Sequence, residues 1–145
     1  MAILKVARLG YPVLREKARP VPVGEIRSAG IQQVIDDMVE TMREYDGAGL
    51  AATQVHQPVQ IAVIEVDANP RYPDAPGIPL TVVINPVVTA LTEEVEEGWE
   101  GCLSVPDMRG MVPRVTAVRL QCYDREANPV DLVAKDFFAR VIQHE

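Results

Sequence analysis

Apolar residues recur at helical spacing in one long segment in the first third of the chain. Between Ser28 and Tyr45 they fall three or four positions apart, at Ile31, Val34, Ile35, Met38, Val39 and Met42. This spacing places them on one buried face of an amphipathic helix. Ser28 is suited to cap the first turn, and Asp46-Gly47 to end the helix. We therefore expect one long N-terminal amphipathic helix, preceded by an irregular, proline-punctuated arm over residues 1–24.

After this helix the pattern changes to short β-branched runs. The runs at 59–66, 81–88, 115–124 and 130–133 are bounded by proline, asparagine or glycine, which favours strands. The segment 67–79 holds four prolines and predicts a surface loop, and 124–129 predicts a hairpin turn. Helices and strands that do not alternate as βαβ units indicate an α+β fold with mostly antiparallel strands.

The chain closes on a second helical pattern. Asp136 is placed to cap it, and apolar residues pair at i, i+4 among Phe137, Phe138, Val141 and Ile142. No glycine, asparagine or proline stop follows, so we expect this C-terminal helix to be truncated at Glu145. A chain of 145 residues with 48% hydrophobic content is most simply one domain, covering 1–145.

Composition excludes several classes of protein. The net charge of −7 argues against a protein that binds nucleic-acid phosphates. No run approaches the ~18 apolar residues of a membrane span, and basic residues interrupt the start of the chain, which excludes a signal peptide. Without an export signal, Cys102 and Cys122 are expected to be reduced thiols in a cytoplasmic compartment.

Three segments contain residues suited to chemistry. In "GAGLAATQ" (47–54) the glycines permit close backbone approach and Gln54 offers an amide donor, although a helix end with a small-residue turn explains the segment equally. In "EGCLSVP" (100–106) Cys102 is either a metal ligand, a nucleophile or a buried structural thiol. His144 and Glu145 begin the motif H-E-x-x-H, which grips a metal from one helix face, but the pair alone is common. His56 is expected to be a surface or structural residue.

Together the three segments are far more specific than any one. In order and separation they resemble the three motifs of the peptide deformylases, and the resemblance extends to "LGYPVLR" (9–15) and to Asn85-Pro86. It covers essentially the whole chain. The resemblance implies an α+β domain packed around a metal-site helix. It also implies a cytoplasmic, bacterial hydrolase that removes the N-formyl group from the methionine of newly made polypeptides and releases formate.

The resemblance also implies roles for individual residues. Cys102 and His144 would bind one divalent metal ion, ferrous iron in the cell, with zinc, nickel or cobalt also accepted at the site. Glu145 would move a proton from the attacking water to the leaving amine. Gln54 and the backbone N–H of Leu103 would stabilise charge on the formyl oxygen. Contacts to the substrate would come from Ala48, Gly49, Glu100, Gly101, Arg109 and Val141, the last beside the methionine side chain. The family's third ligand, a histidine three residues after Glu145, has no counterpart in this sequence.

Two other hypotheses remain open on the sequence. One is a different metallopeptidase built on H-E-x-x-H, and the upstream Cys102 argues against it. The other is a catalytically inactive deformylase-like domain that binds a partner, for example at the ribosome. Retention of Gln54, Cys102, His144 and Glu145 together argues against that. The partners expected are N-formylmethionyl nascent peptides, with transient ribosome association and no nucleic-acid or membrane binding.

Overall fold

The computed structural model describes residues 2–145. The N-terminal arm contains two short 3-10 helices, and a third such helix, η3 (Ala52–Val55), follows the first strand. The remaining elements, in chain order, are α1 (Ala29–Glu44), β1 (Gly49–Ala51), β2 (Ile61–Val66), β3 (Ile78–Ala90), β4 (Val95–Cys102), β5 (Val105–Val115), β6 (Ala117–Tyr123), β7 (Pro129–Lys135) and α2 (Asp136–His144).

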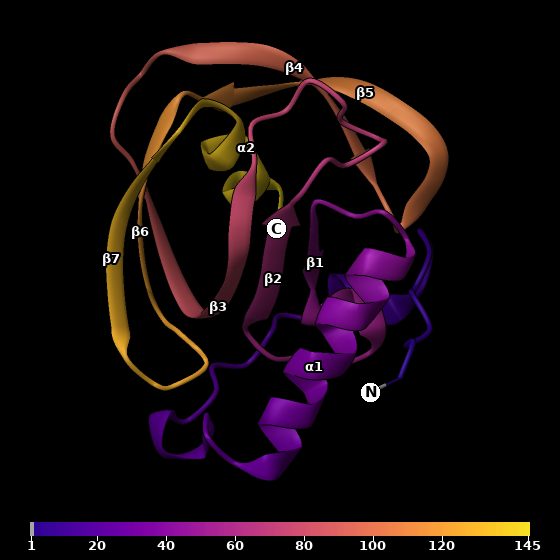
Figure 1. The fold of residues 1–145 in the computed structure, drawn as a ribbon, viewed down its shortest axis with the longest axis vertical. Helices are drawn as coiled ribbons and strands as arrows, with labels where there is room; N and C mark the ends of the chain where they lie inside the picture. The colour runs from indigo at the N-terminus through magenta and orange to yellow at the C-terminus, as the bar shows by residue number, and fades with distance from the viewer. Residues whose placement is uncertain (1) are drawn as a thin grey trace.

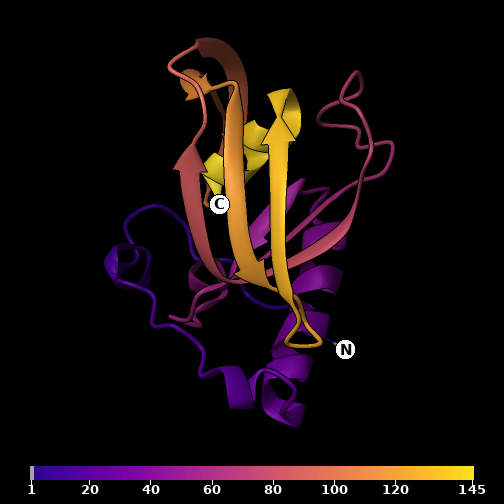
Figure 2. The ribbon, with the colours of Figure 1, turned by 90° about the vertical axis from the view of Figure 1, so that its left-hand side faces the viewer.

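Five strands form one antiparallel sheet in the order β1-β2-β3-β6-β7, and β4 pairs with β5 in a separate two-stranded ribbon. Successive residues of a strand point to opposite faces of a sheet. In β2, Val63 joins the cluster under α1, whereas Ile64 joins the cluster under α2. The two helices therefore cover opposite faces of the sheet, and α2 lies between the sheet and the β4–β5 ribbon (Figures 1 and 2). The expected α+β fold with antiparallel strands is confirmed.

Helix α1 forms where the apolar spacing predicts it. The Ser28 hydroxyl accepts from the N–H of Ile31 at 3.4 Å, which caps the first turn. Asp46, in the left-handed backbone region at φ 53°, takes the chain out of the helix. The description of this helix as N-terminal is wrong, because it begins only at Ala29 and the preceding residues form the arm.

The ribbon β4–β5 was not predicted by the apolar pattern, and neither was the short β1. Residues of β4 and β5 are mostly exposed and include glycine, proline and many charges, so they lack apolar alternation and are held by backbone pairing instead. Strand β3 also begins earlier than predicted, at Ile78, which shortens the preceding loop. Asp136 does not cap α2, because it lies inside the first turn and Lys135 occupies the N-cap position.

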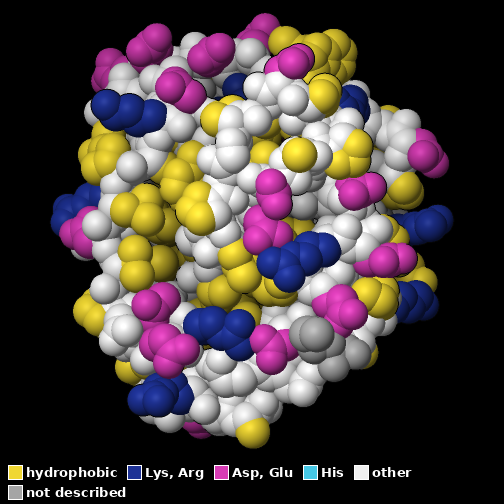
Figure 3. Space-filling view, viewed as in Figure 1, with side chains coloured by type: hydrophobic (Ala, Val, Ile, Leu, Met, Phe, Trp, Pro, Cys, Tyr) yellow, Lys and Arg dark blue, Asp and Glu magenta, His cyan; other side chains and the backbone are white. Residues whose placement is uncertain are grey.

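The arm lies on the body of the protein, as expected. Its N–H groups at Ala7 and Leu9 donate to the carbonyl oxygens of Gln54 at 2.6 Å and Ser104 at 2.7 Å. An apolar groove of about 490 Å³ runs between the sheet and α2, lined among others by Ala62, Ile64, Val83, Leu120 and Ile142. On the face seen in Figure 3, hydrophobic side chains gather left of centre, with charged side chains around them. Within residues 2–145, neither α1 nor α2 is long and apolar enough to cross a membrane.

Candidate active site

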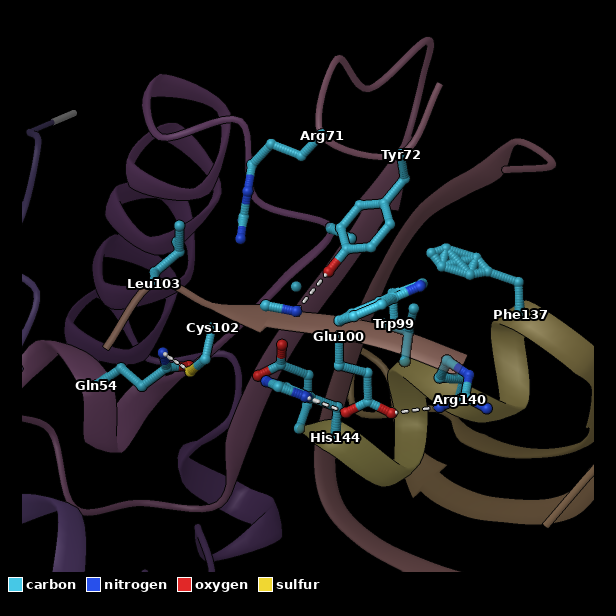
Figure 4. A pocket seen from close by; sticks show the side chains of 15 residues that line it. Gln54, Arg71, Tyr72, Trp99, Glu100, Cys102, Leu103, Phe137, Arg140 and His144 are labelled. Carbon is cyan, nitrogen blue, oxygen red and sulfur yellow. Dashed lines mark hydrogen bonds and ion pairs between the residues drawn. The ribbon is translucent and has the colours of Figure 1, made fainter. Parts of the chain in front are cut away.

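The three candidate motifs meet at one cavity between η3, the end of β4 and the face of α2 (Figure 4). Every candidate residue named from the sequence lines this cavity except Arg109. Its complete lining is Ala48, Gly49, Gln54, Arg71, Tyr72, Trp99, Glu100, Gly101, Cys102, Leu103, Phe137, Arg140, Val141, His144 and Glu145. Residues separated by about a hundred positions are thus brought together by the sheet and the ribbon.

Cys102 ends β4, and the amide of Gln54 is aimed at it. Gln54 is buried, and its side chain is fixed at both ends. The N–H of Ala51 donates to Oε1 at 2.9 Å, and Nε2 donates to the Ser104 hydroxyl at 3.0 Å. The same Nε2 lies 3.6 Å from the sulfur of Cys102. Since both ends of the amide are held, its donor hydrogens are oriented toward the cavity before any ligand arrives.

His144, the last residue of α2, is oriented by Glu100. Its Nδ1 lies 2.7 Å from Oε1 of the buried Glu100 carboxylate, which also accepts two hydrogen bonds from Arg114 and one from Arg140. Burial by itself raises the pKa of the Glu100 carboxyl. The hydrogen bonds from Arg114, His144 and Arg140 outweigh that effect and hold the pKa at about 2. With Nδ1 engaged in this way, the imidazole presents Nε2 to the cavity.

Cys102 and His144 interact directly across the cavity. Burial raises the pKa of the Cys102 thiol, but hydrogen bonds from His144 and the backbone of Ser104 outweigh it, so the net pKa is below its ordinary value. The hydrogen bond to Cys102, and then that to Glu100, raise the pKa of His144 to about 9 against the opposing effect of burial. A thiolate beside an imidazole is the donor pair that binds iron or zinc.

Glu145 lies beside Gly49 at the start of β1. A Cβ atom built on Gly49 would be 2.5 Å from Oε1 of Glu145, so the carboxylate occupies space that only a glycine leaves open. Desolvation raises the pKa of Glu145 to about 7. A carboxylate with a pKa near neutrality is matched to accepting and returning a proton.

The donors present fit a metal ion in kind and orientation. The sulfur of Cys102 and the imidazole ring of His144 face each other, and a carboxylate behind the imidazole fixes its orientation, as is usual for histidine ligands. Within residues 2–145 no group of three histidine, cysteine, aspartate or glutamate side chains is arranged to hold a metal. His56 does not add a ligand, because it is exposed and stacks edge-on against Tyr11 at 5.8 Å.

Several residues of the cavity were missed in the sequence. Arg71 and Tyr72 come from the proline-rich loop, where a length of about a dozen residues was a signal, since long loops in compact domains are often functional. Tyr72 is fixed beside the cavity, because its hydroxyl accepts from the N–H of Gly101 at 3.1 Å. Arg140 stands one turn before His144, and a charged residue among the apolar residues of this short helix was the signal there. Arg109 lies outside the cavity, donates to the carbonyl of Arg71 and stacks over Tyr72 at 5.0 Å.

Comparison with known proteins identifies the relatives of this chain. Residues 3–145 match the family model described as polypeptide deformylase. The chain belongs to the polypeptide deformylase family. It is 46% identical over 143 residues to peptide deformylase 2 of Pseudomonas putida and to peptide deformylase 1 of Nitrosomonas europaea, covering 99% of this chain and 80% of each relative.

Solved deformylase structures share the fold over the whole chain. A class I type b peptide deformylase from Acinetobacter baumannii superposes with a TM-score of 0.96 at 38% identity, covering 100% of this chain and 91% of that one. A peptide deformylase from Thermotoga maritima superposes with a TM-score of 0.86 at 30% identity, covering 100% and 90%. The deformylase resemblance seen in the three motifs is therefore confirmed, and with it the class of enzyme, a metal-dependent hydrolase.

Proposed function

We propose that this chain removes the N-formyl group from the N-terminal methionine of newly made polypeptides and releases formate, with its site at the cavity between η3, β4 and α2. The observation that carries the proposal is the convergence of Gln54, Cys102, His144 and Glu145, from three distant motifs, on one cavity. Family membership supports deformylation over another H-E-x-x-H peptidase. A relative from Acinetobacter baumannii has been solved with Met-Ala-Ser bound, which supports a peptide substrate that begins with methionine.

In this proposal Cys102 and His144 hold a divalent metal ion, and the carboxylate of Glu100 fixes the orientation of the His144 ring. When bound, such an ion supplies hydroxide at neutral pH by lowering the pKa of water from about 16 toward 7. Ferrous iron is the ion we propose for the cell, with zinc, nickel and cobalt as substitutes, because a thiolate and an imidazole accept all four.

Protein groups perform the remaining steps. Glu145 takes the proton of the attacking water and returns it to the amine that leaves, a task that fits a carboxyl pKa of about 7. Negative charge that develops on the formyl oxygen is met by the amide of Gln54 and the backbone N–H of Leu103. One such donor typically contributes ~3–4 kcal/mol to lowering the barrier. Both groups line the cavity, and the Gln54 amide is already held in place.

Substrate binding is assigned to the walls of the cavity. Val141, one turn before Glu145 on α2, contributes to an apolar site for the methionine side chain. Backbone groups of Ala48, Gly49 and Gly101, beside Glu100, line the space that the peptide main chain would occupy. Arg109, which lies next to the cavity over Tyr72, contacts the peptide farther out.

We further propose that residues 1–145 act as one catalytic domain in the bacterial cytoplasm, encountering nascent chains through transient contact with the ribosome. Two apolar clusters on opposite faces of a single sheet support one domain rather than two. Bacterial relatives support the compartment.

The proposal is tested by measuring formate released from a formyl-methionyl peptide in wild type, Cys102→Ser and Cys122→Ser. A deformylase with Cys102 as a ligand loses bound metal and activity in Cys102→Ser and keeps both in Cys122→Ser. A peptidase with a bystander cysteine would keep metal and activity in both variants, and would cleave the peptide bond instead of releasing formate.

A further inference from the structure

A second concave surface adjoins the active-site cavity on the side of the N-terminal arm. This groove has a volume of about 510 Å³ and shares Arg71, Cys102 and Leu103 with the cavity. We call it the cationic groove, and its lining is Lys5, Val6, Arg8, Tyr11, Tyr45, Arg71, Cys102, Leu103, Pro106 and Asp107. Anything that leaves the catalytic cavity past Cys102 and Leu103 enters this groove.

The charge of the groove is opposite to that of the whole protein. Lys5, Arg8 and Arg71 face one acidic side chain, Asp107, although the chain carries a net charge of −7. Within residues 2–145 none of these three cations forms an ion pair. Other arginines beside the site do have partners, since Arg114 and Arg140 both bind Glu100. The groove therefore holds positive charge that the fold does not neutralise.

The arm residues in the groove are held in position by the site itself. The N–H of Ala7 donates to the Gln54 carbonyl at 2.6 Å, and that of Leu9 donates to the Ser104 carbonyl at 2.7 Å. Arg8 lies between these two hydrogen bonds. Its backbone is therefore held against Gln54, the proposed oxyanion donor, and against Ser104, two residues after the proposed metal ligand Cys102. The ammonium of Lys5 lies 5.4 Å from the ring of Tyr11 at the same surface.

Arg71 stands where the groove meets the cavity. Its guanidinium approaches Gly101 so closely that a Cβ there would be 2.7 Å from one of its nitrogens. The side chain descends from the loop between Leu103 and Tyr72, toward the mouth of the site (Figure 4). The guanidinium also lies 5.7 Å from the Tyr72 ring. A cation in this place meets any chain that passes from the cavity into the groove.

We propose that the cationic groove binds acidic side chains in the residues that follow the methionine of the substrate, so that the enzyme favours peptides with glutamate or aspartate there. This inference rests on the proposed function. An extended peptide advances ~3.3 Å per residue, so the first few residues after the methionine span the passage from Cys102 past Arg71. Opposite charges across a concave contact select the partner more than they add raw affinity.

The cavity on the other side of Arg71 does not offer the same selection. That cavity is lined by Arg71, Arg109, Arg114 and Arg140, but also by the carboxylates Asp74, Glu96, Glu97 and Asp136. Its charges balance, and two of its arginines are already bound to Glu100. A preference for acidic residues therefore belongs to the groove between the arm, Arg71 and Asp107.

The test compares two isosteric peptides, Met-Glu-Glu-amide and Met-Gln-Gln-amide, in equilibrium binding followed by Trp99 fluorescence or calorimetry. Both lack the formyl group, so no turnover is needed, and both are amidated, so the side chains alone differ in charge. Exposed ion pairs are each worth ~0.2–1 kcal/mol, so the two pairs that two glutamates can form predict about two- to thirtyfold tighter binding of the glutamate peptide at low salt. Equal dissociation constants would overturn the inference.

A triple variant and its matched control locate the effect. Replacing Lys5, Arg8 and Arg71 by glutamine should bring the ratio of dissociation constants close to one. The control replaces Arg15, Lys17 and Arg27 by glutamine, which changes the net charge equally at exposed positions outside the groove, and should keep the wild-type ratio. A ratio lost equally in both variants would mean that net charge, not the groove, sets the preference, and would refute the assignment.

Two further measurements keep the inference separate from the proposed function. In wild type the preference should vanish in 1 M salt, where the Debye length falls to ~3 Å, and a ratio that survives would contradict the groove as its source. Formate release from formyl-Met-Gln-Gln-amide tests deformylation without any acidic side chain. If formate is released from this peptide while Met-Glu-Glu-amide and Met-Gln-Gln-amide bind equally well, the proposed deformylation stands and the acidic preference of the cationic groove is refuted.

Discussion

The carboxylate of Glu145 lies against the bare α-carbon of Gly49, so closely that a Cβ at Gly49 would be 2.5 Å from Oε1. Glycine at this position is therefore a condition for the carboxylate to occupy the cavity. The motif around Gly49 and the motif that ends in Glu145 are far apart in the chain, and this contact shows how the first makes room for the second.

Gly49→Ala should displace the Glu145 carboxylate and lower kcat by about 100-fold, the usual cost of moving a catalytic group by ~1 Å. Steady-state formate release measures this. Gly110→Ala is the matched control, because nothing lies within 4 Å of a Cβ there, and it should retain wild-type kcat. An unchanged kcat in Gly49→Ala would show that Glu145 does not need this position.

Glu100→Gln should weaken metal binding by about 10- to 100-fold, the range found when a partner behind a ligating histidine is lost. The amide leaves His144 without its carboxylate and removes the charge that Arg114 and Arg140 share. Competition with a chelator gives the affinity. Glu97→Gln, at an exposed position of the same strand, is the control and should bind metal normally; equal affinities in the two variants would contradict the role of Glu100.

Air should inactivate the iron-loaded enzyme faster than an anaerobic atmosphere does. The pKa of the Cys102 thiol lies below its ordinary value and the residue is only half-buried, so the sulfur is open to oxidation. The measurement is the half-life of activity with and without oxygen, with mass spectrometry of the cysteines. Cys122, buried in the sheet and with a raised thiol pKa, should stay unmodified. Equal half-lives would count against the prediction.

The ion pair between Arg43 on α1 and Glu65 on β2 should make a small, pH-dependent contribution to stability. The hydrogen bond from Arg43 lowers the pKa of Glu65 below its ordinary value of 4.5. A lowered pKa stabilises the folded state above pH 4.5, and the contribution is lost as the pH falls through the folded-state pKa.

Glu65→Gln should therefore reduce the free energy of unfolding at pH 7 by less than ~1 kcal/mol, because the arginine is more than half exposed. Urea unfolding of both proteins between pH 7 and pH 3 measures the difference, which should shrink toward the acidic end. Glu44→Gln, exposed and without an ion pair among residues 2–145, should show no such trend. A difference that grows on acidification would have the wrong sign.

The sequence predicted those parts of the fold in which burial alone selects the residues. The stripe from Ile31 to Met42 gave α1, and β-branched runs gave β2, β3, β6 and β7, because one or both faces of each are buried. The ribbon β4–β5 was missed because its side chains are mostly exposed and backbone pairing defines it.

The candidate site was predictable where a motif fixes residue types, and unpredictable where partners come from distant segments. Gln54, Cys102, His144 and Glu145 stand in motifs and meet in the cavity. Arg140 and Arg71 belong to no motif. Their place follows only from the packing of α2 against the ribbon and of the proline-rich loop over Gly101, which are long-range contacts that a linear pattern does not contain.

The central claim is that Glu145, beside the Cys102–His144 pair, drives hydrolysis of a formyl amide. The most direct measurement is formate release from formyl-Met-Ala-Ser by anaerobic, ferrous-loaded enzyme. It compares wild type with Glu145→Gln. Both are measured in residues 1–145 and in a chain extended through a histidine three residues after Glu145, because catalytic metal sites of this kind use three protein ligands. We expect formate from the extended chain and none from its Glu145→Gln variant. No formate from either chain, or equal release by the variant, would contradict the account.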